Sequence, residues 1–285
     1  MVTPRKCVVF LSDFGTADGA VSAMHAVADS VDEKIRIEDL THEIPQFNIW
    51  EASYRLIQAL TYWKAGTVFV CVVDPGVGSE RKSVVALTST GHYIVTPDNG
   101  TLTHVSHALG ITAIREISEA VNRLHNSQQS YTFHGRDVYA YTAAKLASGL
   151  ITFEEVGREL NVKEVVKLEL QPAEEKDGTI IGNIDILDTR YGSLWTNIPK
   201  AMLDKAGITY GCDVNVTISH NNLILFGGVL NFCHNFTEVP LGKPLMYINS
   251  LLNVGIALNQ GNFASSFHIS TGEGWRIELN KVGGR

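Results

Sequence analysis

Apolar positions in the first half of the chain follow two periods, one typical of buried strands and the other of amphipathic helices. Short continuous runs of β-prone residues predict strands, and Val21, Met24, Val27 and Ala28 recur at the spacing of one helical face. The predicted strands are Cys7–Leu11, Ile35–Leu40, Thr67–Val73, Ser83–Leu87 and Tyr93–Thr96, and the predicted helices are Asp18–Ser30, Asn48–Trp63, one after Gly100, and Asp137–Ser148. Alternating strands and helices indicate an α/β domain with a mostly parallel sheet.

The pattern changes near residue 160, where the chain becomes polar and then breaks into short strand-like runs. These runs, separated by turn residues, are typical of a small β-barrel or sandwich. They are Thr179–Leu187, Asp213–Ser219, Leu223–Phe226, Leu245–Ile248, Val254–Leu258, Ser265–His268 and Trp275–Leu279, with one short helix at about Lys200–Lys205. We therefore predict an α/β domain over residues 1–165, a linker over 166–178 and a smaller β domain over 179–285.

Charge and hydropathy exclude two classes of partner. The 285 residues carry 23 Lys and Arg against 30 Asp and Glu, a net charge of -7, and the basic residues form no stripe. An acidic surface repels phosphate backbones, so we expect no nucleic-acid binding. No apolar run approaches the roughly 20 residues that span a bilayer, so we expect no membrane association. The sequence predicts a soluble, cytoplasmic protein.

Cysteine and histidine spacing gives no sign of a metal site. The four cysteines are far apart and form no CxxC pair, so we expect reduced thiols. His104 and His107 are spaced i, i+3, which suits a metal pair, but no third ligand is evident. We therefore expect these two histidines on a helix surface and predict neither a metal nor an organic cofactor.

Two carboxylates follow the first predicted strand, in a turn that also contains glycines. Active sites of open α/β sheets lie at the carboxyl ends of strands, and Asp13 stands at such a position. A carboxylate there can accept hydrogen bonds from a ribose diol or an ammonium group. Asp18 could serve a ligand in the same way, or could cap the following helix. Neither GxGxxG nor GxxxxGK[ST] is present, so the usual dinucleotide and P-loop sites are excluded.

A second set of candidates follows later strands. Asp74 ends the strand at Thr67–Val73, and Arg81 begins the next one, so the two can pair and keep the carboxylate ionised. A purely structural ion pair remains the alternative. His134 lies between Phe133 and Gly135, an arrangement that suits a ligand-facing loop, although a lone histidine is more often structural.

Candidates in the second half are weaker individually. Asp188 and Tyr191 precede the turn glycine Gly192 between two predicted strands, and the pair Asn249 and Ser250 follows a late strand. Taken singly, each is more typical of a turn than of a site.

The ordered combination of these motifs resembles a known family. The motifs are Ser12-Asp13-Phe14-Gly15, Thr41-His42-Glu43-Ile44-Pro45, Val73-Asp74-Pro75-Gly76-Val77-Gly78 with Arg81, Pro97-Asp98-Asn99-Gly100, Phe133-His134-Gly135-Arg136-Asp137, Trp195-Thr196-Asn197 and Asn249-Ser250. In this order they resemble the S-adenosyl-L-methionine hydroxide adenosyltransferases, whose relatives are the adenosyl fluoride and chloride synthases. The resemblance implies an N-terminal α/β domain, a C-terminal β-barrel, and a homotrimer whose active sites lie between subunits.

The resemblance also implies an activity. S-adenosyl-L-methionine is hydrolysed to adenosine and L-methionine when water attacks the 5′ carbon of the ribose. Asp74, Arg81 and His134 match the catalytic set of the hydroxide-transferring branch, whereas halide-using relatives carry Tyr at the position of Asp74. Two alternatives stay open, namely a halide adenosyltransferase and a protein that binds S-adenosyl-L-methionine or adenosine with little turnover.

Further residues are assigned to the substrate by the same resemblance. Asp13 would bind the ribose hydroxyls, Asp18 and Asp188 the methionine ammonium, and Ser250 with Asn249 the carboxylate. The adenosyl group would be enclosed by a third set: Phe47, Phe133, Gly135, Tyr191 and Ser193, the last at a position where relatives often carry an Asn that contacts adenine.

Overall fold

The computed structural model describes residues 3–283. The chain divides into two compact units, Met1–Leu168 and Glu169–Arg285. Of the segment 166–178 that was predicted as a linker, residues 174–176 instead form strand β8, which pairs with the next strand of the second unit. Within the described residues, no helix is both long enough and apolar enough to cross a membrane.

Within residues 3–283, the first unit contains a mixed sheet of seven strands in the order β2-β1-β3-β5-β4-β6-β7. The strands are β1 (Cys7–Ser12), β2 (Arg36–Thr41), β3 (Val68–Val72), β4 (Ser83–Thr88), β5 (Tyr93–Pro97), β6 (Ile111–Glu116) and β7 (Glu159–Leu160). The first four in this order are parallel, whereas β4 runs antiparallel to both of its neighbours. The predicted α/β class with mostly parallel strands is therefore confirmed. Strand β6 was not predicted, because half-exposed residues interrupt its apolar pattern.

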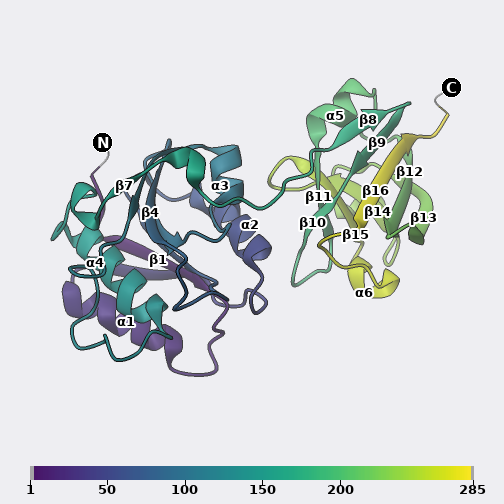
Figure 1. Ribbon diagram of the computed structural model, residues 1–285. Coiled ribbons are helices and arrows are strands. Elements are labelled where there is room, and N and C mark those ends of the chain that lie inside the picture. The colour runs from purple at the N-terminus through teal and green to yellow at the C-terminus, as the bar shows by residue number, and fades with distance from the viewer. Residues whose placement is uncertain (1–2, 284–285) are drawn as a thin grey trace. The chain divides into compact units, whose positions relative to one another are not determined.

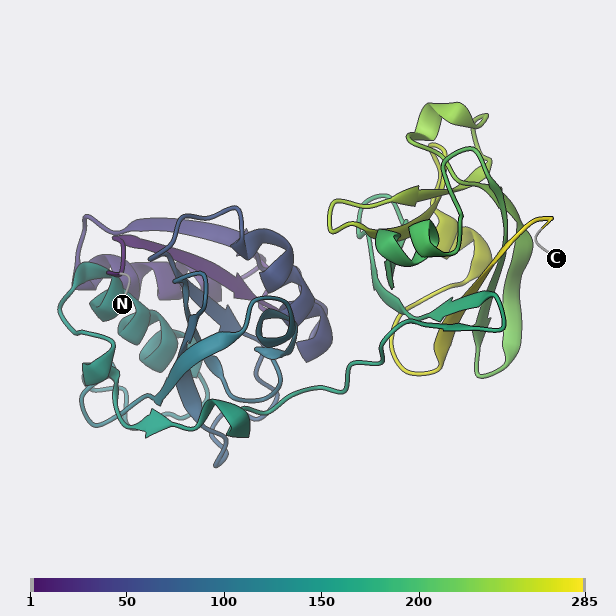
Figure 2. The same ribbon diagram turned by 90° about the horizontal axis from the view of Figure 1, so that it is seen from above.

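Helices cover both faces of this sheet. They are α1 (Ala20–Val31), α2 (Ile49–Leu60), α3 (Thr103–Ala108) and α4 (Tyr141–Ser148), with a π-helical turn η1 (Gly135–Ala140) before α4 and 3-10 turns η2 (Glu154–Val156) and η3 (Val162–Glu164). Helices α1 and α4 pack on one face, and α2 and α3 on the other (Figure 1; Figure 2). The helix predicted over Asp137–Ser148 begins earlier than expected, and its first turn is π-helical.

The core explains why these segments read as continuous apolar runs. Val8 and Phe10 of β1 face α1 and α4, while Val9 and Leu11 face α2 and α3. Successive strand residues point to opposite faces, and both faces are covered, so every position must be apolar. Asn48 caps α2, because its side-chain oxygen accepts a hydrogen bond from the backbone N–H of Glu51 at 2.9 Å.

The connections of β1 determine where a ligand can bind. Strand β1 pairs with β2 on one side and β3 on the other. The chain passes to β2 through α1 and from β2 to β3 through α2, on opposite faces of the sheet. Such a change of direction opens a crevice at the carboxyl ends of the two central strands. Asp13 and Asp74 follow those two strand ends.

The second unit is built from two antiparallel sheets. Its strands are β8 (Glu174–Lys176), β9 (Thr179–Gly182), β10 (Ile184–Leu187), β11 (Leu194–Pro199), β12 (Asp213–His220), β13 (Leu223–Asn231), β14 (Pro244–Ile248), β15 (Asn253–Leu258) and β16 (Trp275–Lys281), with helices α5 (Lys200–Lys205) and α6 (Phe263–Phe267) and a 3-10 turn η4 (Phe236–Glu238). The sheet orders within the described residues are β10-β11-β15-β14 and β13-β12-β16-β9-β8. An isolated bridge between Phe232 and Met246 links them. The expected closed barrel is not confirmed by this arrangement.

Two predicted strands of this unit differ from the structure. The run Thr179–Leu187 is interrupted at Asn183, whose N–H donates to the Asn197 side chain at 2.8 Å, so β9 and β10 join different sheets. The strand predicted at Ser265–His268 is wrong, because this segment belongs to α6 and the turn that ends it. Phe263 and Phe267 are spaced i, i+4 and both contact Phe226, so they share one helical face.

Candidate active site

A cavity of about 340 Å³ opens at the carboxyl ends of β1 and β3. Its lining residues come from the loops after these strands, from the segment before α2, and from the start of η1. They are Asp13, Phe14, Asp18, Ala20, Gln46, Phe47, Val72, Asp74, Val77, Thr132, Phe133, His134 and Gly135. Seven of the residues singled out from the sequence are in this set. Arg81, the eighth from this unit, stands directly behind Asp74.

Arg81 holds the carboxylate of Asp74 through both of its oxygens. Nε donates to Oδ1 at 3.0 Å and Nη2 donates to Oδ2, while Nη1 donates to Ser83 Oγ at 2.9 Å. Both charged groups are largely buried, with side-chain exposures of 5% for Asp74 and 11% for Arg81. Burial is the largest single influence and opposes the guanidinium charge, but the hydrogen bond to Asp74 and the electrostatic contributions of Tyr139, Asp74 and Glu119 together outweigh it, so the pKa of Arg81 is raised. The paired hydrogen bonds therefore fix the orientation of the Asp74 carboxylate.

The same guanidinium reaches His134. Arg81 Nη2 lies 3.0 Å from Nδ1 of the imidazole. A guanidinium has only donors, so Nδ1 accepts, and the proton of the neutral ring sits on Nε2. Burial lowers the pKa of His134 below its usual value, and the positive charge of Arg81 acts in the same direction. Nε2 is buried and has no hydrogen-bond partner in the part of the chain that the structure describes.

Tyr139 and Ser83 complete this network and were missed in the sequence. The hydroxyl of Tyr139 donates to Asp74 Oδ2 at 3.4 Å and lies 3.2 Å from Ser83 Oγ. Burial raises the pKa of Tyr139, so its hydroxyl stays protonated as a donor. The available signal was spacing: Ser83, the first residue of β4, is two residues after Arg81, and Tyr139 is five residues after His134, the hydrogen-bond spacing of a π-helix.

The loop after β1 is tied to the loop before α2. Asp13 Oδ2 accepts the backbone N–H of Phe47 at 2.8 Å. Phe47 has a left-handed backbone, with φ of 65°, and its side chain is exposed. Asp18 Oδ1 accepts the N–H of Ala20, the first residue of α1, at 2.9 Å, although the N-cap residue of this helix is Gly19; Asp18 also lines the cavity.

Aromatic side chains and close packing shape the part of the cavity wall that contains Phe14, Phe133 and Gly135. The rings of Phe14 and Phe133 meet edge to face, with centroids 5.7 Å apart. A Cβ at Gly135 would lie 3.3 Å from each of Met24, Phe14 and Val72. The glycine therefore lets η1 approach β3 and α1 closely, which positions His134 beside Asp74.

A second cavity, of about 1010 Å³, lies in the second unit. Its walls include all five residues singled out from this half of the sequence: Asp188, Tyr191, Ser193, Asn249 and Ser250. Asn249 is buried; its oxygen accepts N–H groups of Leu251 and Asn253, and its Nδ2 has no hydrogen-bond partner within residues 3–283. Asp188 Oδ1 accepts N–H groups from its own loop, at 3.1 Å from Arg190 and 3.2 Å from Tyr191.

Of the two histidines expected on a helix surface, His107 is exposed as predicted, whereas His104 differs. His104 is turned inward rather than exposed: Nδ1 lies 2.9 Å from Ser53 Oγ, and its ring packs against those of Trp50 and Tyr54. His25, Asp39 and His42 come together outside the cavity, in a grouping that could hold a metal ion. The four cysteines all lie within the described residues and are free thiols.

Comparison with known proteins places the chain in a family. Two family models match it: SAM hydroxide adenosyltransferase N-terminal domain over residues 8–157 and C-terminal domain over residues 182–276. A protein of Methanocaldococcus jannaschii named (R)-S-adenosyl-L-methionine hydrolase is 38% identical over 219 residues, which are 75% of this chain and 74% of that protein. A fluorinase of Actinopolyspora mzabensis is 26% identical over 297 residues, covering 96% of this chain and 97% of its own.

A solved structure agrees with these sequence matches. The crystal structure of an uncharacterized conserved protein from Thermotoga maritima has a TM-score of 0.87 and 33% identity to this chain, and covers 96% of this chain and 99% of its own. The resemblance found in the ordered motifs is thus confirmed by independent comparisons of both domains. The chain belongs to the SAM hydroxide adenosyltransferase family.

Proposed function

We propose that this protein is an enzyme that hydrolyses S-adenosyl-L-methionine to adenosine and L-methionine. The observation that carries the proposal is the buried network of Asp74, Arg81 and His134, of which Asp74 and His134 line one cavity together with Asp13. Relatives that bear the name (R)-S-adenosyl-L-methionine hydrolase support it.

The chemistry suits this set of groups. Water attacks the 5′ carbon in line with the departing sulfur; the C–O bond forms as the C–S bond breaks, and the sulfonium leaves as a neutral thioether. The leaving group therefore needs no general acid, and the reaction as proposed requires neither an organic cofactor nor a metal. The attacking oxygen gains negative character as it loses its proton, and it approaches a cationic sulfonium. Excluding bulk water strengthens this attraction and therefore favours the reaction, provided that the oxygen is held in line with the C–S bond.

Roles follow from the hydrogen-bond directions. The attacking water donates to Asp74, which takes the proton as the C–O bond forms and later releases it to solvent. His134 carries its proton on Nε2, so it donates to the water oxygen and orients it. Arg81 holds the Asp74 carboxylate in place and stabilises the charge that develops on the oxygen.

In this proposal the substrate contacts the first cavity of one subunit and the second cavity of a neighbouring subunit. Asp13 accepts hydrogen bonds from the ribose hydroxyls, and Asp18 and Asp188 bind the methionine ammonium. Asn249 Nδ2, a buried donor without a partner among the described residues, is suited to the methionine carboxylate together with Ser250. Aromatic and small side chains enclose the adenosyl group: Phe47, Phe133, Gly135, Tyr191 and Ser193.

We further propose a homotrimer in the cytoplasm, with each active site completed by a neighbouring subunit. Free, mostly buried cysteines suit a reducing compartment. A complementation experiment tests the shared site: Asp74→Asn and the double variant Tyr191→Ala/Ser250→Ala are each assayed alone and after co-refolding. Mixed assemblies should regain activity because some sites then combine two intact halves. Mixtures that never exceed the sum of the separate variants would place each site within one chain.

The activity itself is tested with purified protein, S-adenosyl-L-methionine and ¹⁸O-water, with and without chloride. Equal amounts of L-methionine and adenosine, with ¹⁸O in the 5′ hydroxyl and no chloride dependence, are expected. His125→Ala is the matched control, since His125 is exposed and lies outside the cavity. A halogenated nucleoside would instead assign the chain to halide transfer, and intact substrate after long incubation would assign it a binding role.

A further inference from the structure

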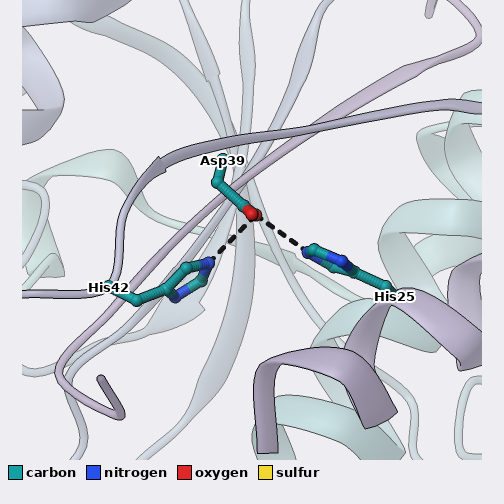
Figure 3. A group of neighbouring side chains, drawn as sticks. All are labelled: His25, Asp39 and His42. Atoms are coloured by element: carbon teal, nitrogen blue, oxygen red, sulfur yellow. Dashed lines mark hydrogen bonds and ion pairs between the residues drawn. The ribbon is translucent and has the colours of Figure 1, made fainter. Parts of the chain in front are cut away.

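Three potential ligand atoms converge beside the loop that carries Asp13. His25 projects from α1, Asp39 belongs to β2, and His42 follows β2 directly (Figure 3). Oδ1 of Asp39 lies 2.8 Å from His25 Nε2 and 2.9 Å from His42 Nε2, and all three atoms are within 4.8 Å of one another. Figure 3 shows both imidazole rings turned toward the same carboxylate oxygen.

The contact at His42 is not a hydrogen bond. Its side chain is only 2% exposed, and Nε2 has no hydrogen-bond partner among the described residues, although Asp39 Oδ1 is 2.9 Å away. Nε2 is therefore close enough to Asp39 Oδ1 for an ion pair, but an N–H on this nitrogen would not point at the oxygen well enough for a hydrogen bond. A buried nitrogen in this state is unfavourable unless something else satisfies it. A cation held between the three ligand atoms would do so.

The surroundings of the cluster suit a bound ion. His42 Nδ1 lies 2.7 Å from Ser12 Oγ, the kind of supporting bond that orients metal-binding imidazoles. The side chains of His25 and Asp39 are 29% and 40% exposed, which leaves a path for the ion and room for a water ligand. One carboxylate and two imidazoles are a donor set typical of zinc and similar transition-metal ions.

We propose that His25, Asp39 and His42 form a binding site for one divalent transition-metal ion, with Zn²⁺ the ion of choice. Each histidine binds through Nε2 and Asp39 through Oδ1, and water fills the open position. The site is separate from the proposed hydrolytic chemistry and does not depend on it.

Metal binding would also stabilise the substrate loop. With the ion on Nε2, His42 carries its proton on Nδ1 and donates to Ser12 Oγ, which also accepts the N–H of Phe14 at 3.3 Å. The carbonyl of His42 accepts the N–H of Gly15 at 2.8 Å. The ion would thus tie the end of β2 to both sides of Asp13 and act as a structural clamp.

The test uses tag-free full-length protein, stripped with a chelator and titrated with Zn²⁺ by calorimetry. Wild type should bind one equivalent, and its unfolding temperature should rise with Zn²⁺. His25→Ala and Asp39→Asn, both at partly exposed positions, should weaken binding at least tenfold and abolish this rise. His107→Ala, at an exposed histidine outside the cluster, is the control and should behave as wild type.

Two spectroscopic measurements decide the outcome without substituting the buried His42. Co²⁺ should give visible bands without a sulfur-to-cobalt band, and imidazole ¹⁵N spectra should place the His42 proton on Nδ1 once Zn²⁺ is added. Absence of binding, equal binding by His25→Ala and wild type, or a sulfur-to-cobalt band from a cysteine would each overturn the proposal and leave the cluster as a hydrogen-bonded contact.

Discussion

Arg81 donates from Nη2 to Nδ1 of His134 across 3.0 Å. This bond determines what the imidazole can do, because a ring that accepts at Nδ1 and is neutral must carry its proton on Nε2. His134 then enters the reaction as a donor and not as the base. The assignment of the proton acceptor to Asp74 follows from this relationship.

Two substitutions of His134 separate these roles. His134→Ala should lower kcat by ~100-fold or more, because no group then orients the water. His134→Gln can place an amide N–H near the position of Nε2 and should recover most of that loss. Steady-state kinetics on both variants would check this. If Gln were as inactive as Ala in a folded protein, His134 would act as the base.

The pH dependence of activity follows from the low pKa of His134, which burial lowers below 6.5. Protonation at Nδ1 would replace an acceptor with a donor facing Arg81 and break their bond. The neutral form therefore persists as pH falls to 6.5, and activity should decline only below that value. A profile of kcat/KM from pH 5 to 9 measures this. An acid limb centred above 6.5 would contradict the proposed role of the neutral ring.

Tyr139→Phe tests the support behind Asp74. The hydroxyl donates to Asp74 Oδ2 and contacts Ser83, so its loss frees one side of the carboxylate. We expect kcat to fall about tenfold, because the loss of one hydrogen bond costs about 1 kcal/mol or slightly more, and we expect KM to stay nearly unchanged. Tyr141→Phe is the matched control, since Tyr141 does not line the cavity. An equal rise in KM would instead indicate a role in substrate binding.

His104 should make the first unit sensitive to acid. Burial lowers the pKa of His104 to about 4, against a usual value near 6.5. Below pH 6.5 the unfolded chain binds this proton more readily than the folded chain, so stability is fully present above 6.5 and is lost as pH falls toward 4. The loss is at most about 3 kcal/mol. His104→Asn should therefore show a flatter dependence of unfolding free energy on pH between 7 and 5. Parallel curves for the two proteins would contradict the prediction.

Local hydrophobic patterns were sufficient to predict an element wherever its residues are uniformly buried. The strands at β1 and β3 are covered on both faces, so their apolar runs were unambiguous. Strand β6 alternates irregularly between buried and exposed residues and was missed. The segment at α6 was misassigned because a five-residue helix is too short to display its period, and the contacts of Phe263 and Phe267 with Phe226 decide its form.

The sequence by itself determined the two-part organisation, the α/β class of the first part and the family. Hydrophobic periods and the order of motifs at strand ends are local features, so they can be recognised without knowing which residues are in contact. It also singled out Asp74, Arg81 and His134 as residue types. Only the tertiary structure decided the direction of the Arg81–His134 bond, the contact of Tyr139 with Asp74, and the meeting of His25 and His42 at Asp39. These depend on strand register and on helices packing across the sheet, so residues distant in the chain become neighbours without a local signal.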